Sequence, residues 1–500
     1  MIWALALENR QNKIIVLAID HMAKGTEKGL WQEIFSNLLK GIYKAISYLS
    51  LKIWRLIKYR FFKIKDRRII YGKLGNQEIF DHPINRNQQT YIMGKPGFGK
   101  SAEAANMALQ NVKNGTPGIF IDPHGNPEEI DDSRKGAIVH IYERAEDISN
   151  IVYLSVNQKY KVIGFNPLFL IASIDALDDL KDELLNSMFG DSLDGGYQVA
   201  NRAKFILESA IYFHNAYADW LMQVLGKTNQ QTKTILQTHQ LTINDLANLN
   251  GNPLLMDLLI QILGYTKSKF ARPDLVRHWQ EVKDKGSLDA GMVGAIGRLE
   301  KIVSTTKAQL FFEAHGFNFI EERRKGKFVL IDTSRLDKFT RAIISKLVFG
   351  KILPLHINGI IREQTELYID EAGDLDFANL DEMLSQGRKF GLSVTAIFQH
   401  FKQFATPRII EAIRKVVVIK IIFRSEEGEY NAPLEKVSNL KKREFIFINS
   451  RGVKEFVKTL DMPPKQRTTM ALIERGVGRD QLRERIMAKR SNIVGYFNNV

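Results

Sequence analysis

The chain has 500 residues, of which 44% are hydrophobic and 25% charged, a balance typical of a soluble globular protein with roughly two or three domains. Its net charge of +15 favours an anionic partner, either nucleic acid or an anionic membrane surface. There is no cysteine, which excludes disulfides, thiolate metal sites and cysteine catalysis.

Residues 30–62 carry one apolar stripe with a helical period. The apolar positions recur at steps of three and four: Leu30, Ile34, Leu38, Ile42, Ile46, Leu49, Ile53 and Leu56. Between Lys40 and Arg68 there are ten basic residues and one acid. Such a helix can lie at a membrane interface, but the same stripe is also how a helix packs on a protein core, which is the reading we favour. No stretch predicts a membrane-spanning helix.

The next segment contains a phosphate-binding loop of the form G-x-x-x-x-G-K-S (Walker A). Its residues are Gly94, Lys95, Pro96, Gly97, Phe98, Gly99, Lys100 and Ser101. The glycines let successive N–H groups point at phosphate oxygens, the lysine contacts the outer phosphates and the serine hydroxyl is placed to ligate Mg²⁺. A short strand at 90–93 and a helix at 101–113 are predicted on either side, which is the context that this loop requires. We therefore predict a nucleotide site.

A second apolar strand, at 118–122, ends in Asp122 and is followed by Pro123, His124 and Gly125. Polar residues at the carboxyl end of a buried parallel strand lie where ligands bind. Asp122 and His124 are therefore candidates for contact with the nucleotide, the metal shell or a moving loop. Alternatively, Asp122 caps the next turn and the other residues only break the chain.

After a long stretch with helical patterns, the strands resume and supply the remaining catalytic candidates. The apolar strand that ends in Asp370 and Glu371 (Walker B) predicts a carboxylate for Mg²⁺, mostly through water, and a second carboxylate that polarises the attacking water. The strand from 393 to 398 brings Gln399 to the same edge, where it could sense the γ-phosphate or orient water. Arg388 precedes this strand, either as a helix-end charge or as an arginine finger for a neighbouring subunit.

These patterns define five segments. They are an N-terminal basic helical region (residues 1–68), the first part of a nucleotide-binding domain (69–171), an all-α insertion (172–320), the second part of the nucleotide-binding domain (321–465) and a basic C-terminal tail (466–500).

The motif set resembles the FtsK–HerA superfamily of P-loop motors, and within it the TraG/TraD-like coupling ATPases of conjugation and type IV secretion. The matching stretches are GKPGFGKS, IDPHG, GFNPL, LYIDEAGDL and LSQGRKFGLSVTAIFQ, together with a late strand and hairpin. The resemblance implies an α/β, RecA-like P-loop NTPase with a mainly parallel sheet. It departs at the N-terminus, where family coupling proteins usually begin with transmembrane helices.

The resemblance also implies a ring, expected to be a hexamer, that hydrolyses ATP with Mg²⁺ and pumps DNA through its channel. It gives Lys100 and Ser101 to the phosphates and metal, Asp370 to the metal, and catalytic roles to Glu371, Gln399 and the finger Arg388. Expected partners are DNA, further copies of the chain and secretion-channel or relaxosome proteins. The expected location is cytoplasmic, with peripheral contact at the inner face of the membrane as an option. Alternatives are a secretion or pilus-assembly ATPase, a HerA-like DNA-processing motor, or a nucleotide-controlled binding platform with little turnover.

Overall fold

The computed structural model describes most of residues 69–500. It does not describe residues 82–87, 127–128, 130, 132–133, 156–160, 165, 170–173, 190–195, 315–321, 323–324, 335, 375–379, 405, 429–431 and 469–475. Residues 1–68 also lie outside the described residues, so the helix predicted over 30–62 stays a prediction. The chain divides into two units between Asp66 and Arg67, and the described residues belong to the second.

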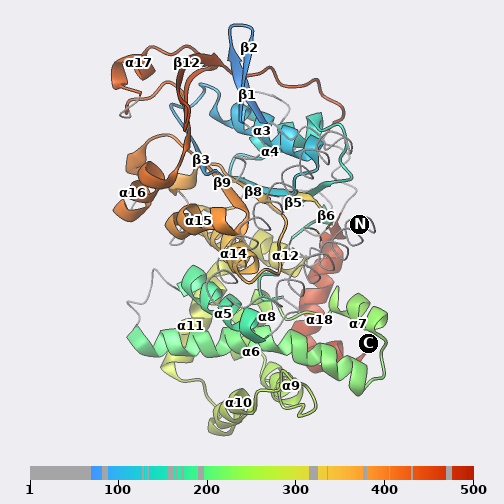
Figure 1. Cartoon of the computed structure of the whole chain (residues 1–500). Helices are drawn as coiled ribbons and strands as arrows, with labels where there is room; N and C mark the ends of the chain where they lie inside the picture. The colour runs from blue at the N-terminus through green and yellow to red at the C-terminus, as the bar shows by residue number, and fades with distance from the viewer. Residues whose placement is uncertain are drawn as a thin grey trace, which may run out of the picture. The chain divides into compact units, whose positions relative to one another are not determined.

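An 11-stranded sheet organises this unit, in the spatial order β2-β1-β12-β11-β10-β3-β9-β8-β4-β7-β5 (Figure 1). Its strands are β1 (Ile69–Leu74), β2 (Gln77–Asp81), β3 (Thr90–Met93), β4 (Gly118–Asp122), β5 (Ile151–Ser155), β7 (Phe328–Asp332), β8 (Thr365–Ile369), β9 (Leu392–Phe398), β10 (Ile419–Ile422), β11 (Glu444–Asn449) and β12 (Gly452–Lys458). The strands from β10 to β5 pair in parallel, and those from β2 to β11 form an antiparallel edge that joins β10. The late hairpin among the matching stretches is thus β11–β12.

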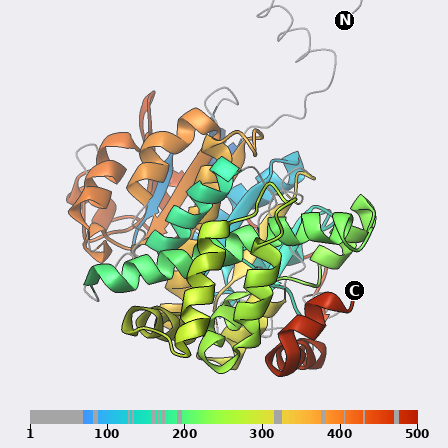
Figure 2. The ribbon, with the colours of Figure 1, turned by 90° about the horizontal axis from the view of Figure 1, so that it is seen from below.

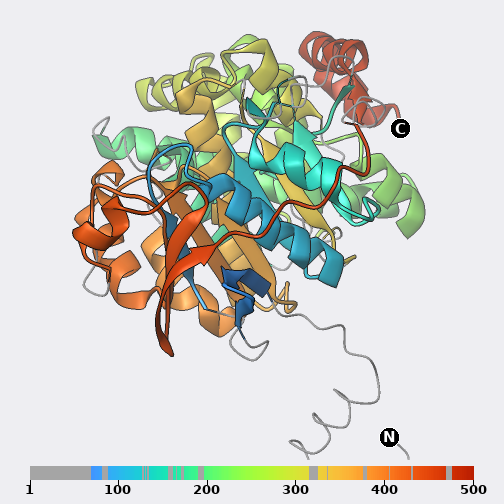
Figure 3. The ribbon, with the colours of Figure 1, turned by 90° about the horizontal axis from the view of Figure 1, so that it is seen from above.

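The central parallel strands are buried on both faces, which explains why they read as continuous apolar runs. Successive residues of β3 alternate between two cores: Ile92 packs with α3 and α4, while Tyr91 and Met93 pack with the helices of the opposite face. Figure 3 shows α3 lying over the sheet, and Figure 1 shows α14 on the other side. The helices around the sheet are α3 (Lys100–Asn114), α4 (Ala137–Arg144), α14 (Lys338–Ile357), α15 (Leu380–Gln386), η6 (Gly387–Phe390), α16 (Pro407–Val416) and α17 (Leu434–Ser438).

The strand order places four chemically important strand ends next to one another. β9 lies between β3, which leads into the phosphate-binding loop, and β8, which leads into Asp370; β4 lies beyond β8. Because these strands are parallel, their carboxyl ends share one edge of the sheet. The fold therefore brings the loop after β3, Gln399 after β9, Asp370 after β8 and Asp122 at the end of β4 to a common edge.

Every element that the structure describes between Ile174 and Glu313 is helical. These elements are α5 (Ile174–Phe189), α6 (Gly196–Gln223), α7 (Asn229–Leu236), α8 (Ile243–Ala247), η4 (Leu249–Gly251), α9 (Leu254–Leu263), α10 (Pro273–Lys285), α11 (Ala290–Ile302) and α12 (Thr306–Glu313). The long α6 packs against α5, α9 and α11, and α5 packs against α14 beneath the sheet (Figures 1 and 2). The exact bounds of the predicted segments stay predictions.

After β12 the chain passes over α3 and α4 and then joins the helical region between Ile174 and Glu313 (Figure 3). Asn106 of α3 donates to the carbonyl of Leu460, and the guanidinium of Arg467 donates to carbonyls at the end of α4. The chain next forms β13 (Val477–Gly478), which pairs with β6 (Lys161–Val162), and α18 (Arg479–Asn498). α18 packs against α9 and α12. The sequence predicted only a basic tail over 466–500 and did not indicate this packing.

A buried ion cluster attaches α18 to the helical region. Lys489 is 1% exposed, and its Nζ lies 2.9 Å from both Asp245 Oδ2 and Glu313 Oε1 and donates to the carbonyl of Gln240 at 2.8 Å. Burial lowers the pKa of Lys489, but the two carboxylates outweigh burial and raise it above its ordinary value. The side chain therefore stays charged and pairs two acids that would otherwise be buried without a counter-charge.

We expect Lys489→Met to destabilise the protein by about 3–5 kcal/mol, because it leaves buried carboxylates without their partner. The measurement is urea unfolding, combined with limited proteolysis to detect release of the C-terminal helix. Arg490→Met, at an exposed position of the same helix, is the matched control and should change stability by less than about 0.5 kcal/mol. Equal stability of the two variants would contradict the role given to the cluster.

Candidate nucleotide site

The phosphate-binding loop has the backbone geometry that its glycines were predicted to allow. Gly94, Gly97 and Gly99 have φ values of 150°, 78° and 116°, which other residues rarely adopt. A Cβ at Gly94 would also lie 2.6 Å from Cβ of Phe423, so close packing excludes a side chain there. α3 begins at Lys100, directly after the loop, so its free N–H groups face the space that the loop encloses.

Neighbouring strands hold the loop from the side. The N–H of Lys95 donates to the carbonyl of Arg424 at 2.7 Å, just beyond β10. The N–H of Arg443, which precedes β11, donates to the carbonyl of Phe98 at 2.9 Å. The loop is therefore preorganised by the sheet rather than by its own contacts alone, which lowers the entropic cost of binding an anion.

Lys100 and Ser101 take up the positions that the motif predicts. The Lys100 side chain is 6% exposed, and its Nζ donates to the carbonyl of Lys95 within the loop at 3.1 Å. Burial lowers the pKa of Lys100, against the opposing effect of Glu371 and Asp370. Ser101 Oγ donates to Asp370 Oδ2 at 3.2 Å. The Walker A hydroxyl and the Walker B carboxylate, 269 positions apart in the chain, thus meet directly.

Asp370 has the surroundings of a cation ligand. It is 2% exposed; its own N–H donates to the carbonyl of Ile121, and the N–H of Glu371 donates to Asp370 Oδ1 at 3.0 Å. Burial, together with the negative charges of Asp122 and Glu371, raises the pKa of Asp370 to about 7. A desolvated carboxylate among other acids is stabilised by a bound cation.

The donors present fit Mg²⁺ in particular. The described residues contain no group of three or more His, Asp and Glu side chains able to enclose a metal. Mg²⁺ binds through few protein oxygens and keeps several waters, often alongside substrate phosphates. One hydroxyl from Ser101 and one carboxylate from Asp370, next to a phosphate-binding loop, match that preference.

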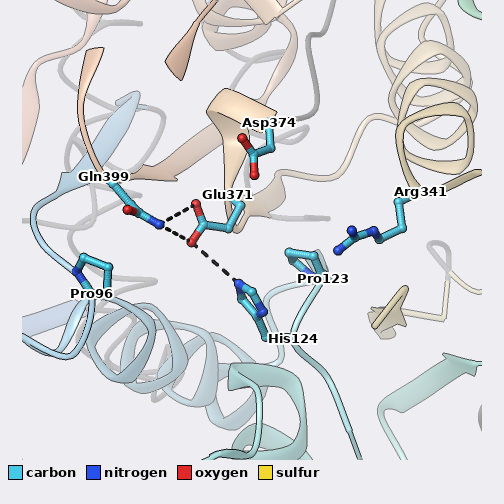
Figure 4. A pocket seen from close by; sticks show the side chains of 7 residues that line it. All are labelled: Pro96, Pro123, His124, Arg341, Glu371, Asp374 and Gln399. Atoms are coloured by element: carbon cyan, nitrogen blue, oxygen red, sulfur yellow. Dashed lines mark hydrogen bonds and ion pairs between the residues drawn. The ribbon is translucent and has the colours of Figure 1, made fainter. Parts of the chain in front are cut away.

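Glu371 lies beside Asp370 and is held by donors from two other strands. Gln399 Nε2 is 3.1 Å from Glu371 Oε1 and 3.4 Å from Oε2, and His124 Nε2 is 3.6 Å from Oε1 (Figure 4). Burial raises the pKa of Glu371, but the contacts with His124 and Gln399 outweigh burial and lower the pKa below its ordinary value. The carboxylate is thus ionised, as a base that accepts a proton from water must be.

These side chains face a cavity of about 290 Å³. Figure 4 shows the residues that line it: Pro96, Pro123, His124, Arg341, Glu371, Asp374 and Gln399. The sequence did not indicate Arg341, and Asp374 was named only as part of the LYIDEAGDL stretch, without a role. Arg341 lies in the first turns of α14, just beyond the carboxyl end of β7, and Asp374 ends the turn η5 (Ala372–Asp374). The signal that could have pointed to Arg341 is its place after an apolar strand ending in aspartate.

The structure brings together the loop residues 94–101, Asp370, Glu371 and Gln399, and it separates Arg388 from them. Arg388 lies in η6 ahead of β9, at the amino end of that strand, and its side chain is exposed. Asp122 turns out to cap its own turn: its carboxylate accepts from the N–H of His124 at 2.7 Å and from that of Ile138 at 3.2 Å. This confirms the capping alternative for Asp122. His124, by contrast, lies beside Glu371 at the carboxyl edge of the sheet.

A phosphate-binding loop, an intervening strand that carries a glutamine and a strand that ends in Asp-Glu, on one parallel sheet, define a RecA-like P-loop NTPase fold. Comparison with solved structures agrees. VirB4 of Thermoanaerobacter pseudethanolicus matches with a TM-score of 0.50 at 14% identity, over 79% of this chain and 96% of that one. The plasmid coupling protein TrwB in complex with ADPNP matches with a TM-score of 0.51 at 13% identity, over 80% and 92%. No protein-family model and no curated protein matches the chain.

At these identities the likeness shows the fold, and it is the fold that the sequence resemblance implied. None of the helices that the structure describes is long and apolar enough to cross a membrane.

Proposed function

We propose that the protein is an ATP-driven motor that moves DNA, acting as a ring of identical subunits in the manner of conjugative coupling ATPases. The observation that carries the proposal is the pairing of Ser101 with Asp370 next to the pairing of Glu371 with Gln399. A protein that only binds nucleotide needs the first pair but not the second. The chain's net charge of +15 and its fold likeness to the plasmid coupling protein TrwB support DNA as the partner.

In the proposed reaction, the N–H groups of the loop and Lys100 bind the phosphates of ATP, and Ser101 and Asp370 hold Mg²⁺. Bound Mg²⁺ would neutralise charge that develops on the phosphate oxygens. Glu371, which lines the cavity, accepts a proton from the attacking water, and Gln399 keeps the carboxylate in place. Catalysis of this kind is mainly positioning and electrostatic stabilisation, which suits a rigid sheet edge.

We expect DNA to stimulate the ATPase activity of the full chain about tenfold or more, since a motor couples turnover to its track. The measurement is the steady-state rate of phosphate release with single-stranded DNA, double-stranded DNA or neither, at two salt concentrations. Stimulation should fall at the higher salt concentration. Binding to the phosphates of DNA releases counterions, so added salt weakens the binding. A rate that no DNA alters would favour the second candidate.

That second candidate is an ATPase that energises assembly of a secretion channel or pilus. The fold likeness to VirB4 supports it. A HerA-like DNA-processing motor would share the DNA response but not the link to secretion. Contacts with secretion-channel or relaxosome proteins, a hexameric ring and a cytoplasmic location belong to the proposal. For residues 30–62, which lie outside the described structure, packing on the protein is the favoured hypothesis and peripheral membrane contact is the alternative.

A further inference from the structure

The catalytic carboxylate is held by a residue that the proposed mechanism does not otherwise use. Glu371 has a φ of 51°, a left-handed backbone conformation that a non-glycine residue adopts at a cost. This backbone conformation sets where the side chain starts, and contacts with neighbouring side chains fix the direction of its carboxylate. Gln399 Nε2 and His124 Nε2 both approach Oε1, while Oε2 receives only the longer contact from Gln399.

His124 comes from a turn whose shape is closely determined. The carboxylate of Asp122 accepts from the N–H of His124 and from that of Ile138, tying the end of β4 to the start of α4. A Cβ at Gly136 would lie 2.3 Å from Asp122 Oδ2 and 2.5 Å from the N of Gly125, so the two chain segments touch as backbone. The position of His124 is thus set by buried contacts, although its own side chain is 60% exposed.

We propose that His124 is a positioning residue for ATP hydrolysis, which orients Glu371 by engaging Oε1 so that Oε2 is presented to the attacking water. The inference rests on the proposed function and deepens it. Glu371 lies at the middle of the three strands involved: β4 supplies His124, β8 supplies Glu371 itself, and β9 supplies Gln399. The two donors follow the strands on either side of β8, so together they hold the carboxylate in one direction. A single donor would leave it free to rotate.

The charge state agrees with this geometry. The contact with the Glu371 carboxylate, more than any other, raises the pKa of His124 to about 9. The imidazole therefore carries both of its protons at neutral pH and donates from Nε2 without depending on the tautomer. Gly125, the next residue, packs against Asp332 at the end of β7, which extends the support one strand further.

We expect His124→Ala to lower kcat for ATP about tenfold while KM changes by less than about twofold, because the ion pair between His124 and Glu371 is lost and no phosphate contact is. His124→Gln, whose amide can reach the same oxygen, should recover kcat to within about threefold of the wild type. His140→Ala, in α4 and away from the cavity, is the matched control and should behave as the wild type. Equal melting temperatures and equal binding of a fluorescent ATP analogue exclude misfolding.

The decisive comparison is made in the background of Glu371→Gln, by single-turnover hydrolysis with Lys100→Ala as the baseline. If His124 acts through Glu371, adding His124→Ala to Glu371→Gln should change the residual rate by less than about twofold. A further tenfold loss in that background, or a raised KM with unchanged kcat, overturns the inference while leaving the proposed function intact. Absence of any turnover that depends on Glu371 in the wild type overturns the proposed function itself, and the inference with it.

Discussion

Replacing Glu371 with glutamine is expected to slow ATP hydrolysis about a thousandfold while ATP binding persists. The substitution keeps the shape of the side chain and an oxygen that can still accept from Gln399 and His124, but it removes the group that takes a proton from water. General bases contribute about 10²–10⁴ in rate, so the loss should fall within that range. Phosphate release under saturating ATP measures the rate, and equilibrium binding of a fluorescent analogue measures the affinity.

Lys100→Ala is the companion variant with the opposite signature. It removes the buried ammonium that faces the phosphates, so it should weaken nucleotide binding as well as abolish turnover. Asp374→Asn, which alters a different acid lining the same cavity, controls for the loss of negative charge alone. Near-normal hydrolysis by Glu371→Gln would show that another group activates the water, and the assignment of the base would be wrong.

The part of the candidate site that the sequence could single out is the part encoded in short contiguous motifs. Gly94 to Ser101 must be continuous because one turn of backbone surrounds the phosphates, and Asp370 and Glu371 are adjacent because both lie at the end of one strand. In the structure the two motifs meet, because Ser101 Oγ donates to Asp370 Oδ2. The place of Gln399 at this edge also follows from a local pattern, an apolar strand that ends in a polar residue. Its predicted role, sensing the γ-phosphate or orienting water, stays a prediction.

What the sequence could not give depends on which strands become neighbours. β4 lies beside β8 although they are separated by the whole helical region, and only this adjacency brings His124 to Glu371. From the residues alone, contact with the nucleotide and capping of a turn were equal alternatives for the segment after β4. Arg341 reaches the cavity for the same reason, because β7 lies next to β4.

The C-terminal helix illustrates a second limit. From the sequence, the basic segment after Pro463 could be helical or loose, and nothing indicated that it is packed, because charge is a poor guide to burial when the partners are distant in sequence. Lys489 is buried against Asp245 and Glu313, which lie 244 and 176 positions earlier in the chain. A lysine whose acids come from other helices has no local signature, so this packing emerges only in the folded structure.

Arg388 remains the prediction with the largest expected effect. The strand β9 delivers Gln399 at its carboxyl end and begins just after Arg388, so about 20 Å of strand separates the arginine from its own nucleotide site. The turn η6 is held in place: His356 Nδ1 lies 2.9 Å from the carbonyl of Phe390, and the N–H of Thr365 donates to the carbonyl of Gly391. Within the described residues the guanidinium of Arg388 has no hydrogen bond or ion pair, and its side chain is exposed.

An arginine fixed on a firm turn, exposed and far from its own site is suited to act on the site of a neighbouring subunit. We expect Arg388→Ala to keep ATP binding and to lose about 10³–10⁵ in turnover, the range for an arginine finger. Lys389→Ala, the exposed neighbour in the same turn, is the matched control and should keep most activity.

Mixing Arg388→Ala subunits with Lys100→Ala subunits decides whether Arg388 acts on the neighbouring subunit or only as a charge within its own. In a mixed ring some sites combine Lys100 of one subunit with Arg388 of the next, so partial activity should return in proportion to the mixing ratio. If rings shown to be mixed recover nothing, Arg388 does not act across the boundary and serves only as a local charge at the end of its helix.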